Sequence, residues 1–173
     1  MANFKEDLVG VKAFIFDIDG VLSLQTIALN SFGVPNRTVN LRDGYALQLA
    51  VKKGYKIGVI SGSSSKEYKK RLKLLGVKDI YLNSRSKVDH FNNFLEKYNL
   101  NKSEVLFMGD DIPDFEVMKL SGVPVCPSDA DSEIKQLASY ISDKKGGEGC
   151  VRDVIEQVLR LHNNWMDSDA FTW

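Results

Sequence analysis

The sequence predicts an α/β domain in which a doubly wound, parallel β-sheet is covered by helices on both faces. Short apolar, β-prone runs alternate with stretches of helical periodicity along nearly the whole chain, as in βαβ units. Runs such as residues 11–16 and 56–60 are apolar over most of their length, which is typical of parallel strands buried on both faces. Polar residues follow these runs directly, at the sheet edge where open α/β sheets bind their ligands.

The individual elements follow from these patterns and from the residues that start and stop them. We expect six strands, at residues 11–16, 56–60, 79–82, 103–108, 122–127 and 140–141. We expect helices from Asp43 to Gly54, from a cap at Ser63–Ser65 to Gly76, at 87–98, from Pro113, at 131–137 and at 151–161. Serine before a helix and glycine after it are usual boundary signals.

Residues 1–162 are predicted to form one domain that contains a small insertion and is followed by a tail. The insertion, at about residues 24–41, alternates loosely around a turn at 33–36 and predicts a β-hairpin. The tail, residues 163–173, is polar apart from Trp165, Met166, Phe171 and Trp173. Aromatic residues on a tail need a surface, and we expect them to dock on a neighbouring subunit or on the chain's own surface.

The composition is that of an ordinary globular protein. The 173 residues include 23 Lys plus Arg and 23 Asp plus Glu, and this balance argues against a general nucleic-acid or anionic-membrane binder. Cys126 and Cys150 lie far apart and fit no metal spacing, so we expect reduced thiols. Residues 1–12 lack the apolar segment of a signal peptide, and no apolar run is long enough to span a bilayer. We therefore expect a cytoplasmic protein.

Two carboxylates follow the first predicted strand, and the rest of the candidate site is organised around them. Asp17 and Asp19 are one residue apart, and Gly20 then allows the chain to turn. An Asp-x-Asp-Gly sequence is also common in turns and in Ca²⁺ loops. A Ca²⁺ loop is excluded here because Val21 and Leu22 are poor oxygen donors and no glutamate closes the loop.

Other polar residues occur at the ends of later strands and suit phosphoryl transfer. They are Ser61 after the second strand, Lys87 after the third, and Asp110, Asp111 and Asp114 after the fourth. Carboxylates can bind Mg²⁺, an aspartate can attack phosphorus, and a hydroxyl and an ammonium can hold the phosphoryl oxygens. Taken singly, each of these residues has a simpler explanation. Ser61 could lie in a turn, Lys87 could be a surface lysine, with Arg85 as an alternative cation, and Asp110 and Asp111 could cap a helix.

The order of these elements resembles that of the haloacid dehalogenase superfamily of phosphatases. This resemblance implies that Asp17 is the nucleophile and that Asp19 is the general acid/base. It also implies that Ser61 binds the phosphoryl group and that Lys87 neutralises it. The implied Mg²⁺ ligands are Asp17, the backbone carbonyl of Asp19, and Asp110, while Asp111 or Asp114 would orient the metal shell or Lys87. The insertion leaves room for a hairpin and no cap domain, as in the capless subclass with a Rossmann-like sheet.

Local matches point to one branch of that superfamily. Segments 40–45, 109–114 and 146–152 resemble those of 3-deoxy-D-manno-octulosonate 8-phosphate (KDO 8-phosphate) phosphatases, which act in lipopolysaccharide precursor synthesis. The resemblance implies a homotetramer in which a neighbouring subunit covers each active site. The implied substrate-binding residues are Asp19, Asn40, Leu41, Arg42, Asp43, Gly44, Gln48, Ser63, Arg71 and Lys87.

Three departures from the branch keep the substrate open. Gln48, Ser63 and Glu148 stand where the branch commonly has arginine. A nonulosonate (KDN or sialic acid) 9-phosphate is therefore an alternative to KDO 8-phosphate. A non-catalytic phosphate-binding or signalling module is the alternative of another class, since receiver domains also combine acidic residues, a hydroxyl and a lysine around Mg²⁺.

Overall fold

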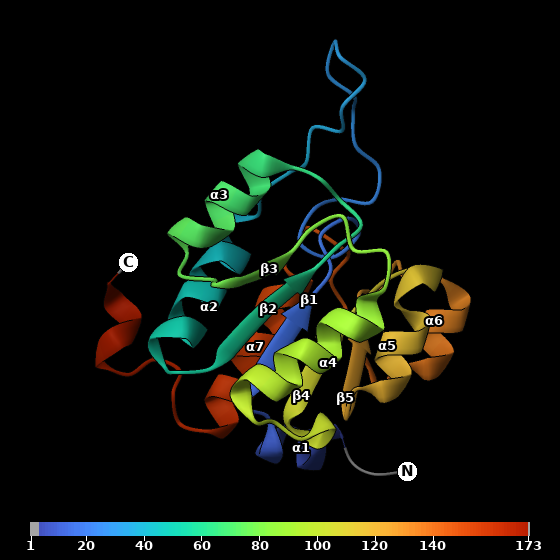
Figure 1. The fold of residues 1–173 in the computed structure, drawn as a ribbon. Helices are drawn as coiled ribbons and strands as arrows, with labels where there is room; N and C mark the ends of the chain where they lie inside the picture. The colour runs from blue at the N-terminus through green and yellow to red at the C-terminus, as the bar shows by residue number, and fades with distance from the viewer. Residues whose placement is uncertain (1–3, 173) are drawn as a thin grey trace.

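The computed structural model describes residues 4–172 and contains one six-stranded parallel sheet (Figure 1). Residues 1–3 and 173, which include Trp173 of the predicted tail, lie outside the described residues. The strands run in the order β3-β2-β1-β4-β5-β6. Their bounds are β1 Ala13–Phe16, β2 Lys56–Ile60, β3 Asp79–Tyr81, β4 Val105–Met108, β5 Val123–Cys126 and β6 Tyr140–Ile141. All six predicted strands are confirmed, and β1 lies between β2 and β4.

Helices cover both faces of the sheet, which confirms the doubly wound α/β fold. Phe14 and Phe16 of β1 pack in one core with α2 (Leu41–Lys52), α3 (Lys66–Leu74) and α7 (Cys150–Leu161). Ala13 and Ile15 face the other core, with α4 (Lys87–Tyr98), α5 (Phe115–Leu120) and α6 (Ser132–Leu137). Because successive side chains of a strand point to opposite faces, burial on both faces explains why β1 is continuously apolar.

Side-chain caps fix where three of the helices begin. The Asn40 side chain accepts hydrogen bonds from the backbone N–H groups of residues 42 and 43, so α2 begins slightly earlier than predicted. Ser65 caps α3 and Ser86 caps α4 in the same way. These caps hold the N-termini of α3 and α4 at the carboxyl edge of the sheet, next to the ends of β2 and β3.

The insertion forms a loop that projects beyond the carboxyl edge of the sheet (Figure 1). Leu29 and Pro35 form a single antiparallel bridge, so the hairpin is shorter than the one predicted. The Asn30 side chain accepts from the N–H groups of Phe32 and Val34 and closes the turn. The loop is too small to be a cap domain.

The described part of the tail docks on the chain's own surface. A short 3₁₀ helix, η4 (Ser168–Phe171), lies beside α2 (Figure 1). Lys53 pairs with Asp167 and Asp169, and Trp165 packs edge-on against Tyr45 of α2. Among the described helices, none exceeds 12 residues and none is both long and apolar enough to cross a membrane.

Candidate active site

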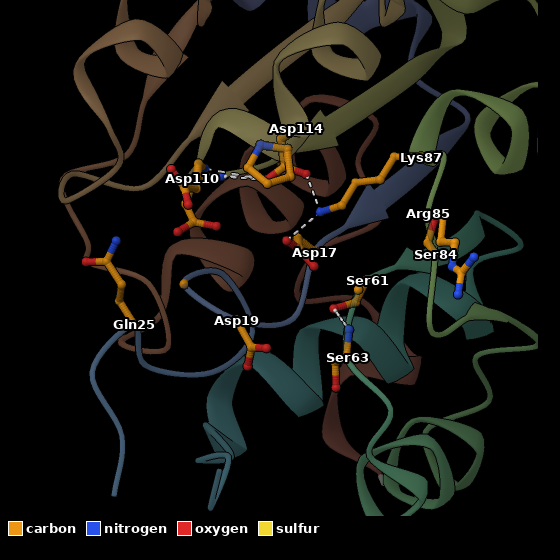
Figure 2. Close-up of a pocket in the computed structure, with 14 residues that line it drawn as sticks. Asp17, Asp19, Gln25, Ser61, Ser63, Ser84, Arg85, Lys87, Asp110 and Asp114 are labelled. Atoms are coloured by element: carbon orange, nitrogen blue, oxygen red, sulfur yellow. Dashed lines mark hydrogen bonds and ion pairs between the residues drawn. The ribbon is translucent and has the colours of Figure 1, made fainter. Parts of the chain in front are cut away.

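A cavity of about 590 Å³ opens at the carboxyl ends of β1, β2 and β4 (Figure 2). It gathers all four predicted catalytic residues, and the parallel sheet explains this, because its strands end at one edge. The predicted residues that line it are Asp17, Asp19, Ser61, Ser63, Lys87, Asp110, Asp111 and Asp114. Arg85, the rival of Lys87 in the sequence analysis, also lines the cavity, together with Gln25, Ser84 and Pro113, for which the sequence predicted no role in the site.

Lys87 joins two carboxylates that come from different strand ends. Its Nζ donates to Asp17 Oδ2 and to Asp114 Oδ1, each at 2.6 Å, and all three residues are buried. Burial opposes the charge of Lys87, but the two carboxylates outweigh it and raise the pKa of Lys87. Lys87 therefore carries a fixed positive charge beside Asp17, and Arg85 does not share this pairing with Asp17 among the described residues.

Asp114, and not Asp111, is the carboxylate that orients Lys87. The second oxygen of Asp114 accepts from the backbone N–H of Asp110 at 3.1 Å, which ties the loop after β4 to the helix that follows it. Asp111 instead uses Oδ1 to accept from the backbone N–H of Ile112, as the cap of the 3₁₀ turn η3 (Ile112–Asp114). The supporting role of either residue in a metal shell stays a prediction.

Close backbone packing places Asp110 against the turn after β1. Gly20 has a φ of +79°, and a Cβ atom there would lie 1.9 Å from Asp110 Oδ2. Gly146, from the glycine-rich loop before α7, packs on the same turn, because its Cβ would lie 1.9 Å from the carbonyl oxygen of Gly20. Only glycine fits either position. The absence of a side chain at Gly20 is what lets the carboxylate of Asp110 approach the turn after β1.

Asp17, Asp110 and Asp114 form a buried acidic cluster in which oxygen atoms from all three lie within 4.8 Å of one another. Burial, followed by the charges of Asp114 and Asp17, raises the pKa of Asp110 to about 8. Burial and the nearby Asp17 also raise the pKa of Asp114. Asp110 Oδ1 is buried and has no hydrogen-bond partner among the described residues. An oxygen cluster with unmet acceptors and excess negative charge fits a hard divalent cation.

The serines after β2 form the opposite wall of the cavity. Ser61 is buried, and its Oγ accepts from the backbone N–H of Ser63 at 3.2 Å. This contact fixes the hydroxyl of Ser61 in a tight turn before the cap of α3. Figure 2 shows Lys87 and Asp114 on one side of Asp17 and the two serines on the other.

Asp19 is paired with a residue that sequence reasoning did not single out. Arg37, from the insertion, donates from Nε and Nη2 to the two carboxylate oxygens of Asp19, each at 2.8 Å. No local pattern signals this contact, because Arg37 lies 18 residues away on an irregular loop.

The predicted substrate-binding residues outside this cavity are divided among other sites. Leu41 and Arg42 line a second cavity, of about 960 Å³, together with Asn40 and Glu148. Arg71 lines a third cavity, of about 450 Å³, together with Arg37.

Three further predicted substrate-binding residues, Asp43, Gly44 and Gln48, belong to α2. Asp43 is buried, and its Oδ1 accepts from the backbone N–H of Arg152 at 2.7 Å, so Asp43 caps α7. Burial raises the pKa of Asp43 to about 6. Gly44 packs against the guanidinium of Arg71, and Gln48 is half-buried on α2. Their roles toward a substrate stay predictions.

Known proteins are similar to this chain in sequence and in fold. The haloacid dehalogenase-like hydrolase family matches residues 76–155. The chain is 32% identical over 149 residues to the 3-deoxy-D-manno-octulosonate 8-phosphate phosphatase KdsC of Salmonella typhi, covering 86% of this chain and 79% of that protein. The chain belongs to the haloacid dehalogenase-like hydrolases.

Solved structures of these hydrolases agree with the fold. The phosphatase of the same name from Moraxella catarrhalis, in complex with magnesium, phosphate and KDO, superposes with a TM-score of 0.90 at 30% identity, over 99% of this chain and 97% of that one. The Yersinia pestis enzyme gives a TM-score of 0.89 at 27% identity, over 93% and 87% of the two chains. This haloacid dehalogenase-like protein is a phosphoric monoester hydrolase without a cap domain.

Proposed function

We propose that the chain is a Mg²⁺-dependent phosphomonoesterase that works through an aspartyl-phosphate on Asp17. The observation that carries the proposal is that Asp17 contacts a buried lysine and belongs to the buried acidic cluster. Asp17 Oδ1 accepts from the backbone N–H of Ile18 and Oδ2 accepts from Lys87, so its carboxylate has a fixed orientation toward the cavity. A fixed carboxylate at the floor of a cavity is suited to in-line attack.

In the first step, an oxygen of Asp17 attacks phosphorus and the ester P–O bond breaks. The electron pair of that bond goes to the departing sugar oxygen, which takes a proton from the carboxylic acid form of Asp19. The Ser61 hydroxyl and the Lys87 ammonium stabilise the negative charge on the phosphoryl oxygens.

In the second step, Asp19 acts as a base. It takes a proton from a water molecule, whose oxygen attacks the phosphorus of the aspartyl-phosphate. The bond between phosphorus and Asp17 breaks, inorganic phosphate leaves, and both carboxyl groups return to their starting forms. Hydrolysis is the simplest outcome for a site that no cap domain closes.

Asp17, Asp110 and the backbone carbonyl of Asp19 would hold the magnesium ion, with Asp114 supporting the cluster. Bound there, the ion supplies positive charge that neutralises the phosphoryl oxygens. The acidic cluster supports this role, because without the ion burial and the neighbouring carboxylates raise the pKa of Asp110.

Addition of Mg²⁺ is expected to raise the melting temperature more at about pH 9 than at about pH 6. Without the ion, the pKa of Asp110 is raised to about 8, so the folded protein favours the protonated carboxyl. The free energy of unfolding therefore falls as the pH rises through that value and Asp110 ionises. Ionised Asp110 binds the ion, so the ion restores stability where the free protein has lost it. Thermal unfolding with and without Mg²⁺ measures this. Asp110→Asn serves as the control and should remove the pH dependence; an equal Mg²⁺ effect at both pH values would contradict the assignment.

The proposed substrate is a phosphorylated sugar acid, and KDO 8-phosphate is the first candidate. The known phosphatases that the chain resembles support it, and so does the Moraxella catarrhalis complex, which holds KDO and phosphate. A nonulosonate 9-phosphate is the second candidate, because Gln48, Ser63 and Glu148 stand where arginines were expected. Glu148 shares the second cavity with Arg42, which changes the charge available there.

A phosphate-release screen over sugar phosphates and sugar-acid phosphates, with Mg²⁺ and with EDTA, tests this function. Metal-dependent preference for KDO 8-phosphate supports the first candidate and a role in lipopolysaccharide precursor synthesis. Preference for a nonulosonate 9-phosphate would make Gln48, Ser63 and Glu148 the residues that set specificity. Absence of turnover with every substrate would favour the phosphate-binding module instead.

Replacing Arg71 with alanine is expected to raise KM for the sugar-acid phosphate by about 10-fold or more, as for loss of a charge-assisted hydrogen bond. The KM for p-nitrophenyl phosphate, which has no carboxylate, should change by less than about twofold. Steady-state kinetics on both substrates measure the difference, with Lys73→Ala, an exposed position on the same helix, as the control. Equal increases for the two substrates would contradict a role of Arg71 in binding the sugar acid.

The proposed assembly is a homotetramer in which a neighbouring subunit covers the active site, in the cytoplasm. Exposed apolar side chains on and beside the insertion support an interface: Leu29, Phe32, Val34, Val39 and Leu41. Cys126 and Cys150 are free and buried, in keeping with a reducing compartment. Light scattering coupled to size-exclusion chromatography measures the mass, and a monomer would contradict the assembly.

A further inference from the structure

Arg37 pairs with both oxygens of the Asp19 carboxylate. Both of its oxygens accept from the guanidinium at 2.8 Å, and the Arg37 side chain is only 10% exposed. Paired N–H···O bonds of this kind are among the stronger polar contacts in proteins. A general acid must carry a proton on the oxygen that faces the leaving group, and a protonated oxygen is a poorer acceptor for a guanidinium, so one of these two contacts is weakened during turnover.

A cavity of about 450 Å³ lies on the far side of this ion pair and is suited to an anion. Arg37 and Arg71 both line it, and Arg71 Nε is buried with no hydrogen-bond partner in the part of the chain that the structure describes. The cavity has one acidic residue, Glu67, which is exposed and accepts from Ser65 Oγ. A buried, unpaired donor costs free energy that an anionic ligand would recover.

Two contacts join this cavity to the catalytic one. Asp19 lines the catalytic cavity and Arg37 lines the other, and the pair itself forms the boundary. The backbone N–H of Ser65 donates to Ser63 Oγ at 3.3 Å, and these serines also lie on either side. When the phosphoryl group of a substrate lies at Asp17, its leaving group would therefore extend past Asp19 toward Arg37.

We propose that Arg37 determines specificity by exchanging its carboxylate partner. A carboxylate on the leaving group takes the guanidinium of Arg37 from Asp19. The freed oxygen of Asp19 takes up a proton from solvent water and then faces the leaving oxygen as the acid. Exchange of the Asp19 carboxylate for the carboxylate of the substrate changes the free energy of the contact with Arg37 only slightly. A neutral sugar offers Arg37 no replacement partner. A substrate shifts the balance between paired and released Asp19 only if it binds the released state more tightly. An anionic leaving group does so because it pairs with Arg37, and a neutral one does not. This inference rests on the proposed role of Asp19.

Leaving groups of different stability separate this exchange from a simple binding effect. A sugar oxygen is a poor leaving group and needs the proton of Asp19, whereas p-nitrophenolate departs without one. Arg37 should therefore affect two sugar phosphates in opposite directions and leave p-nitrophenyl phosphate nearly unaffected.

The test compares Arg37→Gln, Arg37→Lys and the unmodified protein on KDO 8-phosphate, a neutral hexose 6-phosphate and p-nitrophenyl phosphate. For Arg37→Gln we expect kcat/KM to fall for KDO 8-phosphate and to rise for the hexose phosphate. The ratio of the two should drop by about 10- to 100-fold, as for loss of a charge-assisted contact. Arg37→Lys, which keeps the charge without the paired geometry, should give an intermediate ratio. Lys12→Gln, which removes an exposed ion pair with Glu104, is the matched control.

The Asp19→Asn background completes the test. There, Arg37→Gln should no longer raise the rate with the hexose phosphate, because no acid remains to be released. Equal changes for all three substrates, in variants that unfold at the same temperature as the unmodified protein, would overturn the exchange and leave the phosphatase function intact. Absence of phosphate release by the unmodified protein from every substrate would instead overturn the proposed function, and the exchange with it.

Discussion

Replacing Asp17 with asparagine is expected to lower the rate of phosphate release by about 10³-fold or more, while the protein stays folded. Asparagine keeps the shape of aspartate but offers no anionic oxygen to attack phosphorus. Lys87 keeps its contact with Asp114, so the buried ammonium is not left without a counter-charge. The substitution also removes one of the charges that raise the pKa of Asp110, so we expect the melting temperature to be unchanged or slightly higher.

Phosphate release and thermal unfolding, measured on the same sample, check this prediction. Asp89→Asn is the matched control, since Asp89 is an exposed aspartate of α4 that does not line the catalytic cavity. It should retain most of the activity. Substantial turnover by Asp17→Asn would exclude the aspartyl-phosphate mechanism.

Replacing Lys87 with methionine is expected to reduce both the rate and the stability. Removing one partner of a buried ion pair typically costs about 3–5 kcal/mol, because the remaining charge stays desolvated. Here Asp17 and Asp114 would both lose their ammonium partner, and the Asp114 side chain is only 1% exposed. The pKa of Asp114, already raised by burial, should rise further without Lys87. Because a raised carboxyl pKa removes stability as the pH increases, the loss should be larger at pH 8 than at pH 5.

Chemical denaturation of Lys87→Met at these two pH values measures the loss. The double variant Lys87→Met/Asp114→Asn is the decisive control. Its neutral amide can still accept from the backbone N–H of Asp110, so stability should largely return. Activity should stay low, because the charge beside Asp17 is still missing. Recovery of the rate together with stability would show that Lys87 acts only in folding.

The sequence was sufficient to predict the sheet and the catalytic cavity because both depend on local patterns. Each strand is an apolar run, and parallel strands bring the residues after them to one edge, so Asp17, Ser61, Lys87 and Asp110 could be grouped without knowledge of the strand order. Strand starts were less well predicted. β4 begins later than expected because a capping box of Asn101 and Glu104 holds a 3₁₀ turn before it.

Contacts between distant, irregular segments could not be predicted. The pairing of Arg37 with Asp19 depends on how the insertion folds, and no periodicity records that path. The contact by which Asp43 caps α7 across the core is also non-local, and neither position carries a signal for it. The sequence also left the choice between Asp111 and Asp114 open, and one turn of 3₁₀ helix decides which of them reaches Lys87.

The central position of β1 has a consequence for synthesis of the chain on the ribosome. β1 pairs with β2, residues 56–60, and with β4, residues 105–108, so one of its edges stays unpaired until much of the chain has emerged. An open apolar strand edge is a template for aggregation in a nascent chain. β1 therefore completes its pairing late, and Asp17 and Lys87 are both made before Asp110 and Asp114. Chains that stop before residue 105 should depend on chaperones to stay soluble.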